Sequence, residues 1–513
     1  MKFFIFLIVL QASKASKILG IFPTPSISHQ IGFHVLMKDL AARGHELTIL
    51  TTDAIKIENP NVTQIDLHSA YEVFKREFNF VKISKSDMDE ADHIEYFSWI
   101  TEIFLDEELS HAEVQKLIVD KNKYEFDVMI IEHIYYTPML AFAELYDIPV
   151  IGISTTDMFN ENHEMIGNSA NIVLHPEIMF PFVQGRLNFQ ERLKCLKYLL
   201  KYKFRIQPSH NIKMKRIVEK HFPTVNPDLE KLNNRIEFLI VNAHPVMGYI
   251  RPILPNTVQI GFMHIEAPKP LKDGPLKHFL DNSEHGVIYM SFGSNVQSTD
   301  LSSEIKGMFL NTFKRLKYDF IWKFENDDLP EKPENVMIQK WLPQADLLAH
   351  PNIKLFITHG GQQSMEETID RAVPTIVIPF IGDQPANAKR MEQKEIGKHL
   401  ELKSLTSEKL KSTILEMLKP KYKEKIQKLR ELVYDQPMAP RDKAIWCIEY
   451  VIRYKGAKHF HYIGKDVPFY EKYFLDFAAI GISTVCVLML AGYYAVKKLF
   501  FAKTVKNKRN KLE

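Results

Sequence analysis

Short apolar runs of the buried-strand type recur along the chain, and segments with a helical period separate most of them. A helix is predicted at 29–43, with Gly44 as its end, between two of these runs. Strand, helix and strand at this spacing is typical of a parallel βαβ unit, so the pattern predicts an α/β protein with two doubly wound, Rossmann-like domains. The predicted strands are 17–23, 46–51, 127–132, 150–153 and 238–242 in the first domain, and 287–291, 320–323, 336–339, 353–358 and 375–379 in the second.

The segment before the last strand of the first domain has a different pattern. Residues 165–189 are irregular, and 191–221 are helical and basic, with a predicted break at Pro208. Leucines alternate here with lysines, which is typical of a basic amphipathic helix on a membrane surface and equally of an ordinary solvated helix. The residues are Leu193, Leu196, Leu199 and Leu200, with Lys194, Lys197, Lys201 and Lys203.

Apolar segments near both ends predict a secreted, membrane-anchored protein. Residues 1–15 resemble a signal peptide, with a small-residue cleavage site at Ser13-Lys14-Ala15. Residues 477–496 carry no charge and as a helix would span about 30 Å, one bilayer core. Because the tail at 497–513 is basic, the positive-inside rule places it in the cytosol and the rest of the chain in the lumen. A buried core helix is the alternative for 477–496.

The tail ends in Arg509-Asn510-Lys511-Leu512-Glu513, which resembles a dilysine retrieval signal of the endoplasmic reticulum, and a merely solvated basic tail is the alternative. Asn61-Val62-Thr63 is a glycosylation sequon in the predicted lumenal part. The predicted organisation is a signal peptide at 1–15, a first domain at 16–245, a Pro-rich linker at 246–276, a second domain at 277–460, a juxtamembrane segment at 461–476, the spanning helix at 477–496 and the tail at 497–513.

Composition excludes several classes of protein. A length of 513 residues favours two domains over one core. The net charge of +3 gives no basic field for nucleic acid. With three cysteines the chain is not a disulfide scaffold, and no Cys/His pair has zinc-ligand spacing. Neither an essential metal nor another cofactor is expected.

The stretch 339–385 concentrates the candidate chemistry. A predicted strand at 353–358 runs directly into His359, Gly360 and Gly361, and a helical pattern begins near Ser364. A glycine turn between a strand and a helix lets backbone N–H groups face a bound anion, so this turn predicts a phosphate or diphosphate site. The alternative for a Gly-Gly pair is an ordinary turn.

Other residues of this stretch suit a nucleotide sugar. Trp341 offers a flat apolar face for a base, and Gln344 can hydrogen-bond its edge. Glu367, predicted on the first turn of the helix, can accept two ribose hydroxyls, while Asp383 and Gln384, predicted on a loop, can hold the sugar. Each residue taken singly has a simpler interpretation as core or loop, so only the set indicates a binding site.

The order and spacing of this stretch resemble the signature of the UDP-glycosyltransferases, the family of the UDP-glucuronosyltransferases. The similarity extends almost from end to end and is greatest to the insect branch. It includes HVLMKDLAARGHELTILTT near the start, VIYMSFGSNVQSTDL and WKFENDDLP in the middle, and DQPMAPRDKAIWCIEYVIRYKGAKH near the end. The resemblance implies the GT-B arrangement, in which two such domains face each other across a cleft.

The resemblance also assigns roles in the second domain. Trp341 stacks on uracil, Gln344 contacts the base, Glu367 the ribose, and Asp383 with Gln384 the sugar. Backbone and side-chain groups near the glycine turn, together with a second turn after the strand at 287–291, hold the diphosphate. The residues implied for that role are His359, Gly360, Gly361, Gln363 and Ser364, with Ser291, Gly293 and Ser294.

In the first domain the resemblance implies a catalytic dyad. His29 follows the first strand and corresponds to the family's general base, which takes the acceptor proton. Glu132 ends an apolar strand where many relatives have Asp, and would orient that histidine. Further departures from the family pattern are Gln363 in place of Asn, Ala372 in place of Gly, and Gly261-Phe262 in place of Gly-Gly.

The expected activity is inverting transfer of a hexose, glucose before glucuronate, from a UDP-sugar to a hydroxyl of a small lipophilic acceptor. The alternatives are a non-catalytic, membrane-anchored binding protein for a nucleotide sugar or lipophile, and a glycosidase, which needs two carboxylates beside the scissile bond. A homo-oligomer stays open. The candidates for the acceptor pocket are Phe78, Phe80, Phe97, Phe104, Phe159 and Phe180.

Overall fold

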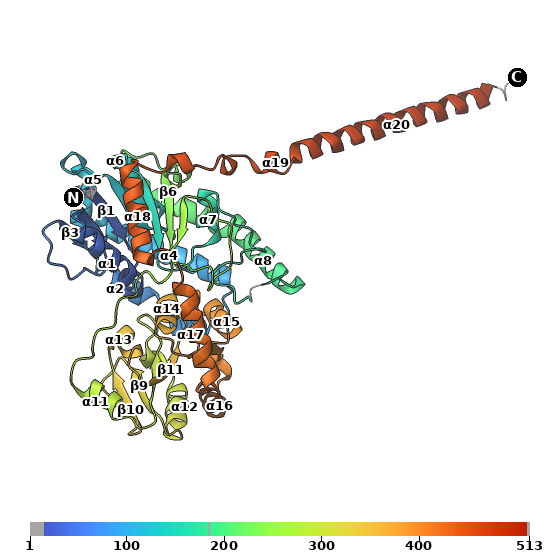
Figure 1. Cartoon of the computed structure of the whole chain (residues 1–513). Coiled ribbons are helices and arrows are strands. Elements are labelled where there is room, and N and C mark those ends of the chain that lie inside the picture. Colours follow the sequence, from blue (N-terminus) through green and yellow to red (C-terminus); the bar gives the residue numbers. More distant parts are fainter. Residues whose placement is uncertain (1–14, 183–184, 510–513) are drawn as a thin grey trace, which may run out of the picture. The chain divides into compact units, whose positions relative to one another are not determined.

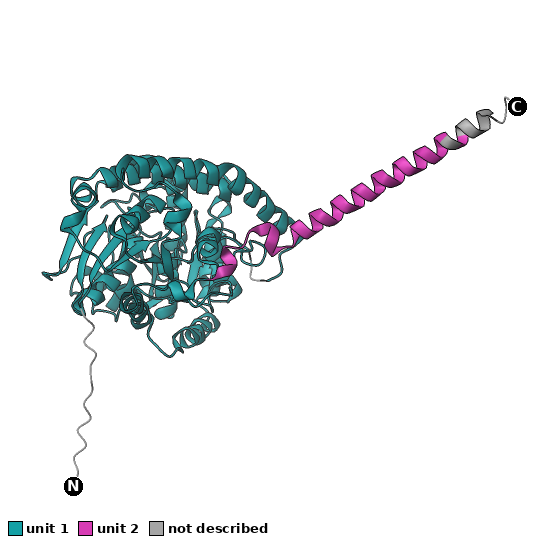
Figure 2. Cartoon of the chain, turned by 90° about the horizontal axis from the view of Figure 1, so that it is seen from above, with its two compact units in different colours: residues 1–461 teal, residues 462–513 magenta. Residues whose placement is uncertain are grey.

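The computed structural model describes residues 15–182 and 185–509. The chain forms two compact units, one ending at His461 and one beginning at Tyr462 (Figures 1 and 2). Nearly all of the predicted signal peptide, and Asn510 and Lys511 of the predicted retrieval signal, lie outside the described residues.

The first unit is built around two parallel sheets, each covered by helices on both faces (Figure 1). The first sheet has the order β3-β2-β1-β4-β5-β6-β7. Leu19 and Ile21 of β1 face one core, and Ile18 and Phe22 face another, because successive strand residues point to opposite faces. The strands are β1 (Lys17–Phe22), β2 (Glu46–Thr51), β3 (Val62–Asp66), β4 (Val128–Glu132), β5 (Val150–Ser154), β6 (Ile236–Val241) and β7 (Thr257–Gln259).

The helices that cover the first sheet mostly connect its successive strands along the chain. Together with these strands and helix α18, described below, they form what we call the first lobe. They are α1 (Ile27–Ala42), α2 (Ala70–Glu77), α3 (Phe80–Ser84), α4 (Glu90–Ser110), α5 (Ala112–Val119), α6 (Ala141–Tyr146), α7 (Asn160–Ile166), α8 (Phe189–Lys201), α9 (Gln207–His221) and α10 (Leu229–Asn233).

The second sheet has the order β10-β9-β8-β11-β12-β13, and with its helices it forms the second lobe. Its core includes Trp322, Phe313 and Phe320, all fully buried. The strands are β8 (Val287–Ser291), β9 (Asp319–Lys323), β10 (Val336–Gln339), β11 (Ile353–Thr358), β12 (Thr375–Val377) and β13 (Gly397–His399). The helices are α11 (Pro275–Asp281), α12 (Ser303–Lys314), α13 (Gln344–Leu348), α14 (Gln362–Asp370), α15 (Gln384–Gln393), α16 (Ser407–Met417) and α17 (Pro420–Tyr434).

After α17 the chain returns to the first lobe. Helix α18 (Pro440–Arg453) places Ile445, Ile448 and Val451 in the same core as Ile18 and Phe22 of β1 (Figure 1). The segment predicted as a linker, 246–276, contributes β7 to the first sheet. The contacts of β7 and α18 therefore assign both to the first lobe, whereas the predicted boundaries put them in the linker and the second domain.

Several local predictions need correction. Pro208 does not break the helix: a π-helical turn at Tyr202–Ile206 joins α8 to α9, and Pro208 lies in the first turn of α9, directly after that π-helical turn. Glu367 lies in the second turn of α14 rather than the first. Gln384, predicted in a loop, is the first residue of α15, and Asp383 is the N-cap residue in the turn before it. Strands β3, β7 and β13 were not predicted, because they are short and only partly apolar.

The second unit contains α19 (Phe469–Lys472) and α20 (Leu475–Arg509). In α20, the segment Leu475–Phe501 has a mean hydropathy of 2.0 and is exposed, and it includes the predicted span 477–496. Among the described residues it is the one helix long and apolar enough to cross a membrane.

Candidate functional site

A cavity of about 490 Å³ lies between the two lobes of the first unit. Its walls come from the carboxyl ends of strands in both sheets, where ligands of doubly wound sheets bind. Of the residues predicted for catalysis and UDP-sugar binding, Glu132 and Gly360 do not line the cavity. The others line the cavity: His29, Ser291, Gly293, Ser294, Trp341, Gln344, His359, Gly361, Gln363, Ser364, Glu367, Asp383 and Gln384.

The structure pairs His29 with Glu132. His29 is in the first turn of α1, and Glu132 is the last residue of the neighbouring strand β4. The Nδ1 atom of His29 lies 2.6 Å from Oε1 of Glu132, and the histidine side chain is 24% exposed while the carboxylate is fully buried. Because the carboxylate engages Nδ1, the Nε2 atom is the ring nitrogen left for a molecule in the cavity.

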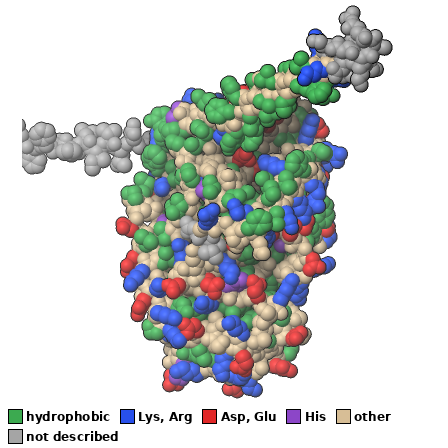
Figure 3. Space-filling view, turned by 90° about the vertical axis from the view of Figure 1, so that its right-hand side faces the viewer, with side chains coloured by type: hydrophobic (Ala, Val, Ile, Leu, Met, Phe, Trp, Pro, Cys, Tyr) green, Lys and Arg blue, Asp and Glu red, His purple; other side chains and the backbone are tan. Residues whose placement is uncertain are grey.

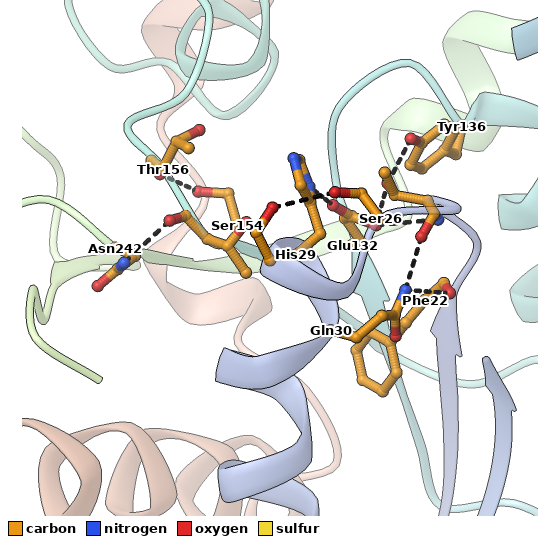
Figure 4. A network of polar contacts seen from close by, with 12 residues as sticks. Phe22, Ser26, His29, Gln30, Glu132, Tyr136, Ser154, Thr156 and Asn242 are labelled. Carbon is orange, nitrogen blue, oxygen red and sulfur yellow. Dashed lines mark hydrogen bonds and ion pairs between the residues drawn. The ribbon is translucent and has the colours of Figure 1, made fainter. Parts of the chain in front are cut away.

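One hydroxyl group bonds to Glu132 from its other side, and a second hydroxyl, that of Tyr136, supports the first (Figure 4). The hydroxyl of Thr24 donates to Oε2 of Glu132 at 2.5 Å, and the hydroxyl of Tyr136 lies 2.5 Å from that of Thr24. Since the Thr24 hydroxyl donates its proton to the carboxylate, its oxygen accepts the hydrogen bond from the Tyr136 hydroxyl. The chain Tyr136, Thr24, Glu132, His29 therefore fixes the carboxylate and, through it, the imidazole ring.

The same groups set the protonation of His29. Burial alone would lower the pKa of His29, but the charge and the hydrogen bond of Glu132 outweigh it, and Asp383 adds to their effect, so the pKa lies above the usual value. Burial raises the pKa of Asp383, and the hydrogen bond from Asn387 opposes that shift. His29 and Asp383 come from opposite lobes, so the dyad of the first lobe faces the start of α15 across the cavity.

The glycine turn after β11 is set by steric contacts. Gly360 has a φ of 88°, and a Cβ there would lie 2.5 Å from Cγ1 of Val377. A Cβ on Gly361 would lie 2.6 Å from Nε2 of His359, and one on Gly293 would lie 2.7 Å from Cε1 of the same ring. Only glycine therefore permits this backbone path around His359.

Around this turn the cavity offers polar groups but little exposed charge. Burial, with the nearby charge of Lys323, lowers the pKa of His359 to about 4, so its ring is neutral near pH 7 and can donate a hydrogen bond. Ser291 accepts a hydrogen bond from the backbone N–H of Gly293, and the buried hydroxyl of Ser294 has no hydrogen-bond partner among the described residues. Lys323, a cavity residue that sequence analysis missed, pairs with Glu325 at 2.9 Å.

Two of the three residues predicted for the nucleoside, Gln344 and Glu367, are joined by a hydrogen bond. The side-chain amide of Gln344 donates to Oε2 of Glu367 at 2.7 Å and to the hydroxyl of Ser364 at 2.9 Å. The hydroxyl of Tyr289 donates to the amide oxygen of Gln344 at 3.1 Å. Trp341 is exposed at the rim, where its ring is accessible for stacking.

Sequence analysis missed His264, which lies in the segment between the lobes. Its Nδ1 atom is 3.2 Å from Oε2 of Glu366, and its Nε2 atom is 3.7 Å from Oε1 of Glu367. Burial alone would lower the pKa of His264, but the two carboxylates raise it to about 9, so the ring is an imidazolium near neutral pH. No motif marks this histidine, because its partners lie about 100 residues later in the chain.

Asp383 and Gln384 are held at the start of α15. Asn387 donates to Asp383 at 2.7 Å and to the carbonyl of Gly360 at 2.9 Å. The amide oxygen of Gln384 accepts from the backbone N–H groups of Phe380 and Ile381. The NH2 group of Gln384 is thus left to face a ligand, and the helix start is connected to the glycine turn.

Side-chain contacts join the lobes beside the cavity. Ser26 and Asn295 exchange hydrogen bonds at 2.9 and 3.2 Å. The amide of Gln363 donates to the backbone carbonyl of Thr155 at 3.3 Å, so this departure from the family pattern reaches the first lobe. Asn242 donates to Glu366 across the same boundary at 3.2 Å.

The part of the cavity within the first lobe is largely apolar. Of the predicted acceptor-site aromatics, Phe80, Phe97, Phe104 and Phe159 line it. Phe78 does not line it, because its ring packs among Phe74, Phe80 and Phe97 in the core. Phe180 is likewise buried, against Phe182 and Tyr198.

The sequence matches the family described as UDP-glucoronosyl and UDP-glucosyl transferase over residues 17–511. The chain belongs to this family. It is therefore a UDP-glycosyltransferase, and a UDP-sugar donor and an acceptor follow from the family. An ecdysteroid UDP-glucosyltransferase of Mamestra brassicae nuclear polyhedrosis virus is 30% identical, covering 88% of this chain and 87% of the relative. The UDP-glycosyltransferase UGT5 of Dactylopius coccus is 30% identical, with coverages of 94% and 91%.

Solved structures confirm the GT-B fold of this family member. The calicheamicin glycosyltransferase CalG4 matches with a TM-score of 0.57 at 15% identity, covering 86% of this chain and 99% of that chain. A UDP-glucosyltransferase from Polygonum tinctorium matches with a TM-score of 0.56 at 15% identity and the same coverages. In the described part of the chain, no group of three or more His, Cys, Asp or Glu side chains is placed to hold a metal ion.

Proposed function

We propose that this enzyme transfers glucose from UDP-glucose to a hydroxyl of a small lipophilic acceptor, with inversion at the anomeric carbon and without an essential metal or other cofactor. The observation that supports the reaction most directly is the 2.6 Å contact between His29 and the buried Glu132 on the cavity wall. Such a pair is the arrangement that a general base needs, because the carboxylate fixes the ring and stabilises its cation.

In this mechanism Nε2 of His29 takes the acceptor proton. The acceptor oxygen then forms a bond with the anomeric carbon, while the bond from that carbon to the diphosphate oxygen breaks and UDP leaves with the electron pair. The developing charge on UDP would be stabilised by the backbone of the glycine turn and by the hydroxyl of Ser294, which is unpaired within the described part of the chain. Asp383 and Gln384 would hold the sugar hydroxyls, and Trp341, Gln344 and Glu367 the nucleoside.

The test is a comparison of transfer and binding in one variant. His29→Gln should lower transfer at least about a thousandfold, because it removes the proton acceptor, while UDP affinity measured by calorimetry stays within about twofold. The wild-type and variant chains are assayed with labelled UDP-glucose and labelled UDP-glucuronate. Full activity of His29→Gln would refute the base assignment, and preference for UDP-glucuronate would refute the donor assignment.

The apolar half of the cavity supports a lipophilic acceptor. Burial of an apolar molecule against phenylalanine rings is favoured by about 25 cal/mol per Å² of apolar surface removed from water. The viral relatives are named ecdysteroid UDP-glucosyltransferases, so a hydroxylated steroid is the first acceptor class to assay, beside simple phenols. Phe104→Ala should raise the KM for such an acceptor more than the KM for UDP-glucose.

The location that we propose is the membrane of the endoplasmic reticulum, with the first unit in the lumen and the basic tail in the cytosol. Support comes from the length and hydropathy of α20 at Leu475–Phe501 and from the lysines that follow it. A glycan on the exposed Asn61 would report lumenal orientation through a mass shift on deglycosylation. An Asn61→Gln variant that shows the same shift would exclude this position as the glycan site.

A further inference from the structure

Helix α8 and the π-helical turn after it expose apolar side chains to a degree that is unusual for a helix of a folded unit. Phe189 is 71% exposed, Leu196 49% and Phe204 80%. The helix face that carries them, which we call the α8 face, consists of Phe189, Leu193, Leu196, Leu199, Leu200 and Phe204. Hydrophobic side chains are frequent on the side of the molecule that carries α8 (Figure 3). Contiguous apolar patches of this kind usually mark a contact with another phase or molecule.

Two of the basic residues of α8, Lys194 and Lys201, point away from that face. Lys194 pairs with Glu90, and Lys201 pairs with Asp89 and Asp92, at distances of 2.5 to 3.0 Å. Their partners lie in α4 or at its N-cap, so these lysines point towards the protein and their charge is neutralised there. A water-exposed helix has the opposite arrangement, with leucines inward and lysines outward.

The inner side of the helix borders the acceptor half of the cavity. Cys195 and Tyr198 are buried in one cluster with Ile178 and Met179, and these last two residues line the cavity. The inner side of α8 and the apolar part of the site thus share one hydrophobic cluster. A molecule bound on this face would therefore lie close to the region where a lipophilic acceptor would bind.

We propose that the α8 face docks on the surface of the lipid bilayer, an inference that rests on the membrane anchor of the proposed function. Thirteen residues, 462–474, separate the first unit from the apolar helix, and even fully extended they reach at most about 47 Å. The first unit of an anchored chain therefore stays close to the bilayer. The occupant is a lipid because the face combines leucines with a phenylalanine at each end, and because the exposed Arg192 and Lys197 can reach headgroup phosphates.

The test uses the full chain in lipid nanodiscs with an environment-sensitive dye on single cysteines. In a Cys486→Ser background, Leu196→Cys carries the dye on the α8 face. Leu415→Cys is the matched control, because Leu415 is 46% exposed on α16 of the second lobe. The native Cys486 in α20 reports the anchor, while Cys195 and Cys447 are buried. Retained UDP affinity verifies that each labelled variant is folded.

Lipids that carry a quencher near the headgroup should dim the dye at position 196 at least about twofold more than at position 415. Quenching at Cys486 by a deep-chain quencher, without headgroup quenching at 196, would overturn the docking proposal and leave the anchor intact. Absence of quenching at both positions would overturn the anchor as well. A dye at 196 that is shielded from both lipid and aqueous quenchers would show a protein partner there and would also overturn lipid docking.

Discussion

At the scale of single residues, the reacting centre depends on a carboxylate 103 positions away from its histidine. Strand β4 lies directly beside β1 in the sheet, so Glu132 and the start of α1 meet at the same sheet edge. Local residue pattern identifies both strands, but only the family resemblance pairs these two side chains. Thr24 and Tyr136, which hold the carboxylate in place, have no local pattern that separates them from other strand-end residues.

Glu132→Gln should change the pH profile as well as the rate. Without the carboxylate charge the pKa of His29 falls, so the base stays unprotonated to lower pH. The acid limb of the pH profile of kcat/KM should therefore shift to lower pH. The value of kcat should fall by about 10²- to 10⁴-fold, because the imidazolium formed in the reaction loses its partner. Glu132→Asp, which retains the charge, should keep the limb near its wild-type position. An unchanged limb in Glu132→Gln would show that another group titrates.

His264→Gln should remove a pH dependence of stability. The folded pKa of His264, about 9, lies above the unfolded value near 6.5, so its contribution is fully present below pH 6.5 and is lost as the pH rises through 9. Between pH 6.5 and 9.5 the wild-type chain should lose about 3 kcal/mol more unfolding free energy than the variant, as measured by urea titration. UDP affinity should also weaken, because Glu367 loses a partner. Equal pH slopes for both proteins would contradict this role.

At the scale of elements, the turn between β11 and α14 predicts a sharp response to one methyl group. Gly361→Ala forces its Cβ against the ring of His359, so the turn must shift and UDP affinity should fall at least about tenfold. Gly307→Ala is the matched control, since Gly307 lies in α12 with nothing within 4 Å of the added atom. Calorimetry should find its UDP affinity unchanged and its stability equal or higher by up to about 1 kcal/mol. Normal affinity in Gly361→Ala would refute the steric explanation.

The pattern of the chain was sufficient for the central strands and for the edge strand β10, but not for the other three edge strands. Strands β1, β4, β8 and β11 are buried on both faces and appear as apolar runs. The edge strand β3 is half exposed, and β7 and β13 have three residues each, so their sequences resemble loops. Asp383 precedes Gln384 and a proline, which suggested a loop, whereas proline is favoured in the first turn of a helix such as α15.

At the scale of the whole molecule, the destination of α18 could not be predicted. Its apolar stripe shows that it packs on something, but the stripe fits either core. In the structure the helix completes the core of the first lobe. Nothing local distinguishes a helix that follows the second domain and stays with it from one that returns.

Ile448→Ala should therefore destabilise the first lobe. Ile448 is fully buried beside residues of β1 and α1, and its truncation should cost about 2 to 5 kcal/mol of unfolding free energy. Leu415→Ala, at an exposed site on α16, should change it by less than about 1 kcal/mol. Hydrogen exchange should locate the loss in β1 and α1. Increased exchange confined to the second sheet would show that α18 belongs to the second lobe.

The path of α18 has a consequence for how the enzyme exchanges its nucleotide. Both ends of the folded unit, β1 and the segment up to Phe460, belong to the first lobe, so the second lobe is an insertion connected by two crossings, before α11 and after α17. The tether to α20 starts from the lobe that is proposed to hold the acceptor. The second lobe, proposed to hold the nucleotide, can thus rotate open to release spent UDP and admit a fresh donor while the first lobe and its proposed membrane attachment stay in place.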